Sequence, residues 1–237
     1  MFTCLIATPK SRMYTDGEYL KKHPTWHVED SKWKAQQIQN MLHEHKLEPQ
    51  TICEVGCGAG EILVQLQAHL GDNYTFFGYD ISPEALELCK ERGNEKLRFV
   101  LGDITLEADA SFDLLLLVDV IEHIEDYLGF LREVRTKARY KIFHIPLEFT
   151  AIAALRRWPK DTWIDLGHIH SFTRDTALQS LRDTGYTIID YSYTLEFKHR
   201  LRSRNVILNL MRATIFSISD DLAVRLLGGC PLLVLTE

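Results

Sequence analysis

Three glycines at alternate positions follow a short apolar run and precede a run with helical periodicity. They are Gly56, Gly58 and Gly60, and the apolar run is 51–55. Glycine adopts positive φ at little cost and lets a ligand approach the backbone closely, while the N-terminus of a helix favours a carboxylate or a phosphate. This spacing indicates a loop that binds a small charged molecule.

Two acidic residues follow the next two predicted strands. Asp80 ends the second strand and stands 20 residues after Gly60, where a carboxylate can accept hydrogen bonds from both hydroxyls of a ribose. Asp103 follows the third strand and is placed to accept an adenine amino group. The loop and the two acids together indicate a nucleoside-containing ligand. The dinucleotide fingerprint G-x-G-x-x-G needs glycine where this chain has Glu61, which argues against NAD.

Histidines supply the candidate acid–base groups. His168 and His170 alternate in an extended segment before a helix, so both side chains face one side and can reach one pocket. His144 lies near the end of a strand, and His123 lies just past another. Each can remove a proton from a hydroxyl acceptor or serve as a hydrogen-bonded structural group. We take His168 and His170 as the first candidates. No metal site is predicted, because no nearby carboxylate or cysteine completes a clear ligand set.

The elements that position these residues alternate between strands and helices. Single helices between strands predict a doubly wound, Rossmann-like α/β fold, with a seven-stranded sheet that is mostly parallel and has an antiparallel last strand. The continuous apolar run FDLLLLV is typical of a central parallel strand. Strands are expected at 51–55, 74–79, 97–101, 112–118, 140–145, 186–195 and 232–235, and helices at 31–45, 62–70, 85–92, 124–137 and 173–184.

Three regions lie outside this alternation. We expect a single domain over 1–237 with an N-terminal helical cap at 1–47 and two lid insertions at 147–170 and 196–229, because loops of that length usually border a ligand. Trp26 and His27 in the cap can close over the cofactor or the acceptor, or they can pack as hydrophobic groups against the sheet. The second insertion holds a basic cluster at 198–204, then an apolar stretch. This combination suits an anionic acceptor, an anionic membrane or a dimer helix.

Composition narrows the class of protein further. The 237 residues carry a net charge of -6, which argues against a nucleic-acid partner. The cysteine count of 5 is odd, which favours reduced thiols and a cytoplasmic location. No apolar run approaches ~18 residues, and no basic segment precedes the first apolar residues, so neither a membrane span nor a signal peptide is expected.

Four motifs in order make the sequence resemble the class I S-adenosylmethionine-dependent methyltransferases, particularly small-molecule enzymes related to the ubiquinone-biosynthesis methyltransferases. The motifs are CEVGCGAG (53–60), YDIS (79–82), LGDI (101–104) and FDLLLLVDVIEHIED (112–126), in a resemblance that covers 30–195. The resemblance implies S-adenosylmethionine as cofactor, S-adenosylhomocysteine as product, and in-line methyl transfer to an oxygen or nitrogen atom. The implied acceptor is a small molecule, such as a sugar or a specialised metabolite.

The resemblance also implies which residues contact the cofactor. They are Glu54, Gly56, Cys57, Gly58 and Gly60 around the methionine part, Asp80 at the ribose, Ile81, Asp103 and Ile104 at the adenine, and Val118 and Asp119 beside the sulfonium. Two alternatives stay open: a binding module without turnover and, less favoured, an NAD-dependent oxidoreductase. The chain has DVIE at 119–122 instead of an Asn-Pro-Pro-Tyr-like tetrapeptide, which argues against base or glutamine-amide methylation. The acceptor, O- versus N-transfer and the oligomeric state stay open, with a homodimer among the options.

Overall fold

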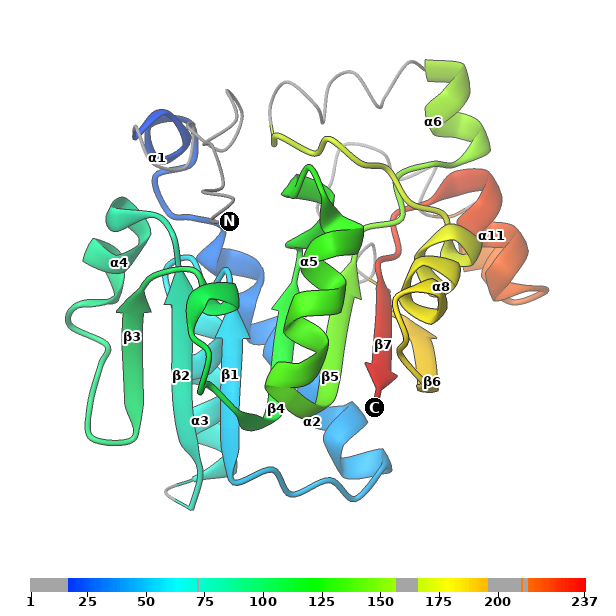
Figure 1. The fold of residues 1–237 in the computed structure, drawn as a ribbon. Coiled ribbons are helices and arrows are strands. Elements are labelled where there is room, and N and C mark those ends of the chain that lie inside the picture. Colours follow the sequence, from blue (N-terminus) through cyan, green and yellow to red (C-terminus); the bar gives the residue numbers. More distant parts are fainter. Residues whose placement is uncertain (1–16, 72, 157–165, 196–209, 211–212) are drawn as a thin grey trace. The chain divides into compact units, whose positions relative to one another are not determined.

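The strands form one seven-stranded sheet in the order β3-β2-β1-β4-β5-β7-β6 (Figure 1). The computed structural model describes residues 17–71, 73–156, 166–195, 210 and 213–237. Strands β1 to β4 pair in parallel, and β6 pairs with β7 in the antiparallel sense, which confirms the expected α/β sheet. The strands are β1 (Thr51–Val55), β2 (Thr75–Asp80), β3 (Leu97–Leu101), β4 (Phe112–Val118), β5 (Ala138–Ile145), β6 (Ile188–Tyr193) and β7 (Leu232–Thr236).

The chain divides into two compact units. Unit 1 comprises Met1–Val118 and Glu133–Ile142, and unit 2 comprises Asp119–Arg132 and Phe143–Glu237. The single domain with a cap and two lids stays a prediction. Within the segments expected as lids, the structure has α6 (Ala151–Arg156) and α11 (Asp220–Leu227). The basic cluster at 198–204 and most of the apolar stretch after it lie outside the described residues.

Unit 1 is built around the central apolar strand. Leu114, Leu115, Leu116 and Leu117 in β4 are at most 1% exposed, as expected of a parallel strand covered on both faces. Val55 pairs with Tyr79 of β2, so the carboxyl ends of the neighbouring strands meet at one edge. Helices α2 (Ser31–Glu44) and α3 (Glu61–Leu70) pack on each other, and α4 (Pro83–Cys89) contacts β2 and β3.

The helices next to the predicted ligand loop have clear boundary signals. Gly60 has φ 75 and caps α3, which ends at Gly71. Ser82 caps α4 by accepting a hydrogen bond from the Ala85 amide at 3.2 Å, and Pro83 occupies the first helical position. This helix therefore begins two residues before the expected start at 85 and ends at Cys89 rather than at 92.

Unit 2 contains α5 (Tyr127–Val134, whose last two residues belong to unit 1) and α8 (Arg174–Asp183). The helix expected at 124–137 is shorter: a 3-10 turn, η4 (Ile121–His123), precedes it and η5 (Arg135–Lys137) follows. Tyr186 anchors the core of this unit, because its ring lies edge-on to Phe143 at 5.2 Å and its hydroxyl donates to the Leu131 carbonyl at 2.7 Å.

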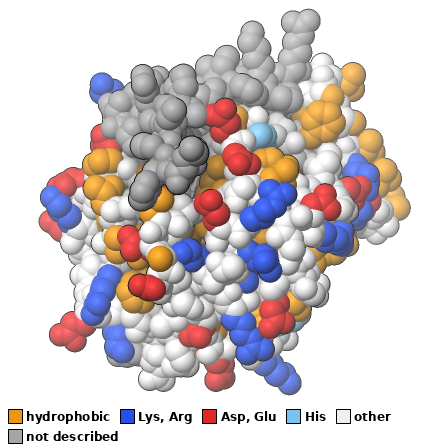
Figure 2. Space-filling view, in the orientation of Figure 1, with side chains coloured by type: hydrophobic (Ala, Val, Ile, Leu, Met, Phe, Trp, Pro, Cys, Tyr) orange, Lys and Arg blue, Asp and Glu red, His pale blue; other side chains and the backbone are white. Residues whose placement is uncertain are grey.

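The remaining surface and thiol observations concern the described residues only. Acidic and basic side chains are interspersed on the face shown in Figure 2. No helix in the described part of the chain has the length and apolar character to cross a bilayer. Cys53, Cys57, Cys89 and Cys230 are free and buried.

Candidate functional site

The glycine loop after β1 has the backbone that only glycine adopts readily. Gly56, Gly58 and Gly60 have φ of 69, 53 and 75. The amides of Gly56 and Cys57 both donate to the Tyr79 carbonyl, at 2.8 and 3.1 Å. These bonds hold the loop at the carboxyl edge of β1 and β2.

Asp80 at the end of β2 joins this loop to the next one. Its Oδ2 accepts from the Gly58 amide and its Oδ1 from the Ser82 amide, both at 2.8 Å. Only 8% of the residue is exposed, and this burial raises the pKa of Asp80, although the bonds from Ser82 and Gly58 act in the opposite direction. Each carboxylate oxygen keeps further acceptor capacity for a ligand hydroxyl.

The next loop places the remaining predicted adenine contacts. Asp103 Oδ1 accepts from the amide and the hydroxyl of Thr105, at 2.9 and 2.8 Å, and so caps η3 (Ile104–Leu106). The Ile81 side chain is 47% exposed and available to a ligand, whereas Ile104 is fully buried. Ile81 therefore fits the expected contact with an adenine face. The side chain of Ile104 is inaccessible to a ligand, so only its backbone could contact the adenine.

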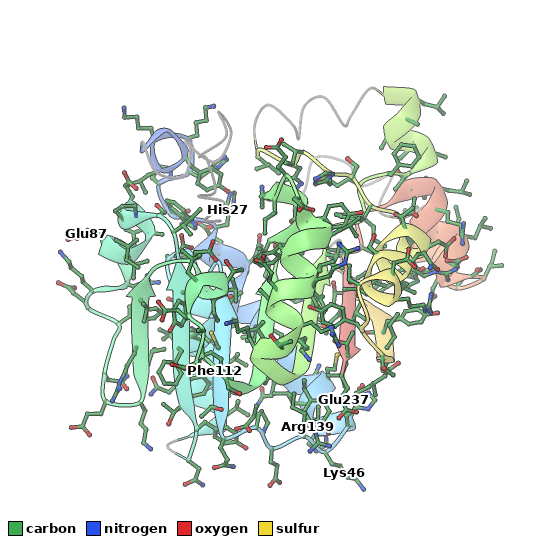
Figure 3. All side chains as sticks on the ribbon, in the orientation of Figure 1. His27, Lys46, Glu87, Phe112, Arg139 and Glu237 are labelled. Carbon is green, nitrogen blue, oxygen red and sulfur yellow. The ribbon has the colours of Figure 1, made fainter. Side chains whose placement is uncertain are left out.

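A group of rings, which we call the aromatic cover, lies over the glycine loop of unit 1. It comprises Tyr19, His23, Trp26 and His27; the Tyr19 and Trp26 rings are 5.0 Å apart and the two histidine rings 4.6 Å. A methyl group built on Gly58 would lie 2.5 Å from Trp26 Cδ1, so the indole rests on the loop. His27, labelled in Figure 3, lies at the opposite end of the strands from Phe112, where β4 begins.

Two consecutive residues of the aromatic cover have a strained backbone. Trp26 and His27 have φ of 50 and 59, in the left-handed region that bulky residues rarely adopt. Such strain concentrates where a ligand is bound. Burial, followed by the charges of His23 and Lys34, lowers the pKa of His27, so its ring is neutral at pH 7.

The other predicted methionine-side residues of unit 1 are mostly buried. Glu54, Cys57 and Val118 are 2%, 7% and 6% exposed. A hydrogen bond with Cys89, together with burial, raises the pKa of the Cys57 thiol well above its ordinary value. Cys57 is therefore a neutral packing group in the loop rather than a nucleophile.

In unit 2, Asp119 and His144 form a hydrogen-bonded pair. His144 Nδ1 lies 2.6 Å from Asp119 Oδ1, and its Nε2 lies 3.2 Å from the Thr194 hydroxyl. The His144 side chain is 2% exposed and that of Asp119 is 28% exposed. Asp119 has φ 54, another left-handed residue that is not glycine. Of the two side chains, that of Asp119 is the more exposed, and the buried His144 contacts its Oδ1.

The structure groups the other histidines differently from the sequence expectation. His168 and His170 do not share partners: His168 Nδ1 lies 2.8 Å from Glu148 Oε1, whereas His170 Nε2 lies 2.9 Å from the Ile124 carbonyl. The His168 ring instead meets that of His123, with centroids 4.7 Å apart at 81°. The expectation that His168 and His170 reach one pocket, which rested on their alternate positions in an extended segment, therefore did not predict their partners.

Sequence reasoning missed two acidic neighbours of these rings, Glu122 and Glu148. Glu122 is fully buried beside His123. The dipeptide Glu122-His123 was visible in the sequence, but nothing local indicated that a segment 46 residues later would meet it. Trp26 was singled out, but its contact with Gly58 depends on the tertiary fold.

Comparison with known proteins agrees with this architecture. Residues 53–139 match a family model described as a methyltransferase domain. The chain is 31% identical over 108 residues to norajmaline N-methyltransferase of Rauvolfia serpentina, a match that spans 43% of this chain and 36% of the relative. It is 30% identical over 95 residues to the mitochondrial ubiquinone biosynthesis O-methyltransferase of Schizosaccharomyces pombe, across 37% and 34% of the two chains. The matches thus span about a third of the length of these relatives.

The fold is shared with solved methyltransferases of low sequence identity. Magnesium protoporphyrin IX methyltransferase from Synechocystis PCC 6803, solved with bound SAH, aligns with a TM-score of 0.59 at 14% identity, over 95% of this chain and 91% of that one. This likeness concerns the fold alone. Over residues 53–139, the chain is similar to the methyltransferase-domain family, and its curated matches are methyltransferases.

Proposed function

We propose that this chain transfers a methyl group from S-adenosylmethionine to an oxygen or nitrogen atom of a small molecule. The observation that carries the proposal is Asp80, whose two oxygens hold the Gly58 and Ser82 amides at 2.8 Å. This carboxylate stands where the family motif has its ribose ligand, and the named relatives include one N- and one O-methyltransferase of small molecules.

The residues of unit 1 fit the proposed cofactor. Glycine at position 58 leaves the backbone without the Cβ that would collide with Trp26. Asp80 offers acceptor capacity to the ribose hydroxyls, Asp103 offers it to the adenine amino group, and the exposed Ile81 offers an apolar contact. Trp26 of the aromatic cover shields the loop at Gly58. Bound there, S-adenosylmethionine supplies an electrophilic methyl group on a sulfonium.

We assign the residues of unit 2 to the acceptor. A hydroxyl acceptor needs a group that takes its proton, while an amine needs only to be held neutral. Asp119 has the more exposed side chain of the pair, and His144 fixes its orientation through the 2.6 Å contact. Asp119 is therefore the proposed proton acceptor, and His144 is a positioning residue. In-line placement of acceptor and methyl group supplies about 7–11 kcal/mol in well-aligned reactions.

Calorimetric titration tests the cofactor first. We expect S-adenosylmethionine and S-adenosylhomocysteine to bind the wild type and the control Asp109→Ala, which changes an exposed acid of unit 1. Asp80→Ala removes the acceptor of two amides and should abolish binding. NADH binding without either sulfur compound would overturn the proposal.

Methyl transfer is then measured with radiolabelled cofactor on a panel of phenols, sugars and amines. Turnover that falls in Asp119→Asn, while cofactor affinity stays at the wild-type value, supports the proton-acceptor role. Binding of the cofactor with no transfer to any acceptor would favour the binding-module alternative.

A further inference from the structure

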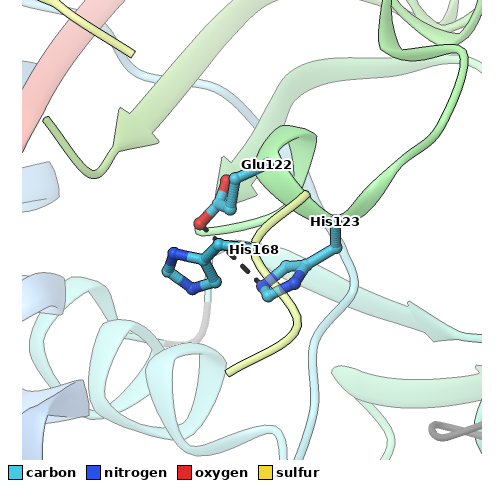
Figure 4. A group of neighbouring side chains, drawn as sticks. All are labelled: Glu122, His123 and His168. Carbon is cyan, nitrogen blue, oxygen red and sulfur yellow. Dashed lines mark ion pairs between the residues drawn. The ribbon is translucent and has the colours of Figure 1, made fainter. Parts of the chain in front are cut away.

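Unit 2 holds a group of side chains that the proposed methyl transfer does not use. Glu122 and His123 lie on the turn η4, and His168 lies in the segment before α8. Figure 4 shows the three side chains converging from these two segments. Each can offer one ligand atom, and the three atoms all lie within 4.8 Å of one another.

Both imidazoles are oriented as metal-binding histidines usually are. His168 Nδ1 lies 2.8 Å from the Glu148 carboxylate, and His123 Nδ1 lies 3.3 Å from the Gly167 carbonyl. Both partners accept hydrogen bonds, so each Nδ1 is the donor and each Nε2 is the nitrogen that a metal ion would use. A carboxylate or a carbonyl behind a ligand histidine is the common arrangement at metal sites, because it fixes the tautomer and raises the basicity of the ring.

Burial and charge make this group suited to a dication. Glu122 is fully buried, the His168 side chain is 9% exposed, and that of Glu148 is 11% exposed. Two carboxyl groups thus lie in one poorly hydrated place beside two imidazole rings. Buried charges in proteins are usually paired or coordinate a metal ion, and a divalent cation would balance both carboxylates.

Backbone hydrogen bonds already hold the two segments together. The Glu122 carbonyl accepts from the amides of Ile169 and His170, at 2.8 and 3.1 Å. His170 adds a side-chain bond to the Ile124 carbonyl at 2.9 Å. The ligand side chains are therefore placed by a supporting network, as a preorganised site requires. His170 belongs to that network, not to the ligand set.

We propose that Glu122, His123 and His168 bind a divalent transition-metal ion, with Glu148 as the carboxylate that orients His168. Metal–ligand bonds of about 2.0–2.2 Å place neighbouring donors about 3–3.5 Å apart, so a movement of about 1 Å per side chain closes the site. Two imidazoles with a carboxylate favour zinc, cobalt, manganese or iron over magnesium and calcium, which prefer oxygen ligands alone. The site lies wholly in unit 2 and does not depend on the proposed methyl transfer.

Cobalt(II) absorption and calorimetry of the full chain test the site without cofactor. After treatment with EDTA and dialysis, the wild type should bind one Co2+ per chain, with a visible ligand-field band, and one Zn2+ or Mn2+ by calorimetry. Glu122→Gln and His168→Asn should lose the band. Glu148→Gln should weaken binding by about 10–100-fold, the usual effect of removing such an orienting carboxylate.

Matched controls separate this site from casual binding by surface histidines. The pair His43→Asn and His45→Asn at the end of α2, outside this group of side chains, should keep one-to-one binding. His123→Asn, at a ring that is 18% exposed, serves as the ligand variant if His168→Asn fails to fold. Absence of one-to-one binding, or binding that survives both His123→Asn and Glu122→Gln, would overturn the proposal.

Discussion

At the scale of single residues, Asp80 is subject to two opposed effects. Burial favours its neutral acid form, while the amides of Gly58 and Ser82 favour the carboxylate, and the net result is a raised pKa. A ribose diol donates hydrogen bonds best to an ionised carboxylate. Cofactor binding therefore depends on a proton equilibrium that lies above the ordinary range for aspartate.

The first prediction concerns pH and cofactor affinity. Because the pKa of Asp80 is raised, protonation begins at a higher pH than the usual value of about 3.9. The affinity for S-adenosylhomocysteine should hold at neutral pH and fall on acidification through that raised pKa. Titration calorimetry between pH 4 and 8 measures it. Asp80→Asn should bind weakly at every pH, and a wild-type affinity that rises on acidification would contradict the assignment.

The second prediction separates backbone strain from crowding at Gly58. Gly58→Ala adds a Cβ 2.5 Å from Trp26 Cδ1 at a φ of +53, so it should lower the free energy of unfolding by about 2–4 kcal/mol. Gly71→Ala has positive φ with nothing within 4 Å and should cost about 1 kcal/mol. Gly102→Ala meets nothing and has no such φ, so it should be close to neutral. Urea unfolding measures the free energy of unfolding of the three variants. An equal loss for Gly58→Ala and Gly71→Ala would show that the Trp26 side chain moves aside at no energetic cost.

At the scale of elements, α8 is fixed at its start by a reciprocal cap. The Thr173 hydroxyl accepts from the Thr176 amide at 3.1 Å, and the Thr176 hydroxyl accepts from the Thr173 amide at 2.9 Å. The helix directly follows the segment that carries His168 and His170. Its cap therefore also fixes where that segment ends.

The third prediction removes this cap. Thr173→Ala should lower the free energy of unfolding by about 1 kcal/mol, within a usual range of about 0.5–2 kcal/mol for N-cap loss. Thr136→Ala, at an exposed residue of η5, is the matched control and should change stability little. Urea unfolding at pH 7 measures both, and equal effects of the two would argue against the cap.

Helices α8 and α11 are joined by an exposed network of charges. Arg174 contacts Asp175 and Asp221 at 2.7 Å each, and Arg225 contacts Asp175 at 2.6 Å. The hydrogen bonds from Arg174 and Arg225 lower the pKa of Asp175. A carboxyl with a lowered pKa stabilises the fold above its unfolded value and loses that contribution as pH falls.

The fourth prediction follows from the lowered pKa of Asp175. The contribution of Asp175 should be complete above about pH 3.9, the ordinary value for aspartate, and vanish as pH falls through its lowered pKa. Asp175→Asn should therefore reduce stability at pH 7 and make little difference near pH 2. Urea unfolding at both values measures it. High salt should shrink the effect, because the network is exposed.

Element types and order were predictable because they depend on local patterns. The strands β3 and β4 coincide with the expected 97–101 and 112–118, since their apolar runs are bounded by polar residues. The helix expected at 124–137 was too long at both ends, because residues 124–126 connect η4 to α5 and its last three residues form the 3-10 turn η5. The position of β7 between β5 and β6 depends on long-range pairing and has no local signal.

At the scale of the whole molecule, the fifth prediction uses ligand linkage. S-adenosylhomocysteine at 100 times its Kd should stabilise the chain by about 2.7 kcal/mol, which corresponds to an increase in Tm of about 5–10 °C at this size. Scanning calorimetry measures the shift. Asp80→Ala should show none, while Asp109→Ala should follow the wild type.

The candidate site was predictable to different degrees in the two units. Unit 1 could be anticipated, because Asp80 and Asp103 follow strands whose carboxyl ends must share an edge in a parallel sheet. The burial of Ile104 could not, since it follows from packing around η3. In unit 2, the partners of His168 come from segments 20 and 46 residues away, a distance that no periodicity spans.

The contact of Trp26 with Gly58 gives this protein a built-in optical reporter. An indole resting on the loop must change its surroundings when a cofactor enters beside it, so its emission wavelength and its quenching by iodide should report occupancy directly. The chain has 4 tryptophans, and replacing Trp33, Trp158 and Trp163 with phenylalanine would leave Trp26 as the sole emitter. The time course of that signal after rapid mixing would reveal whether the N-terminal segment opens before the cofactor binds or closes after it.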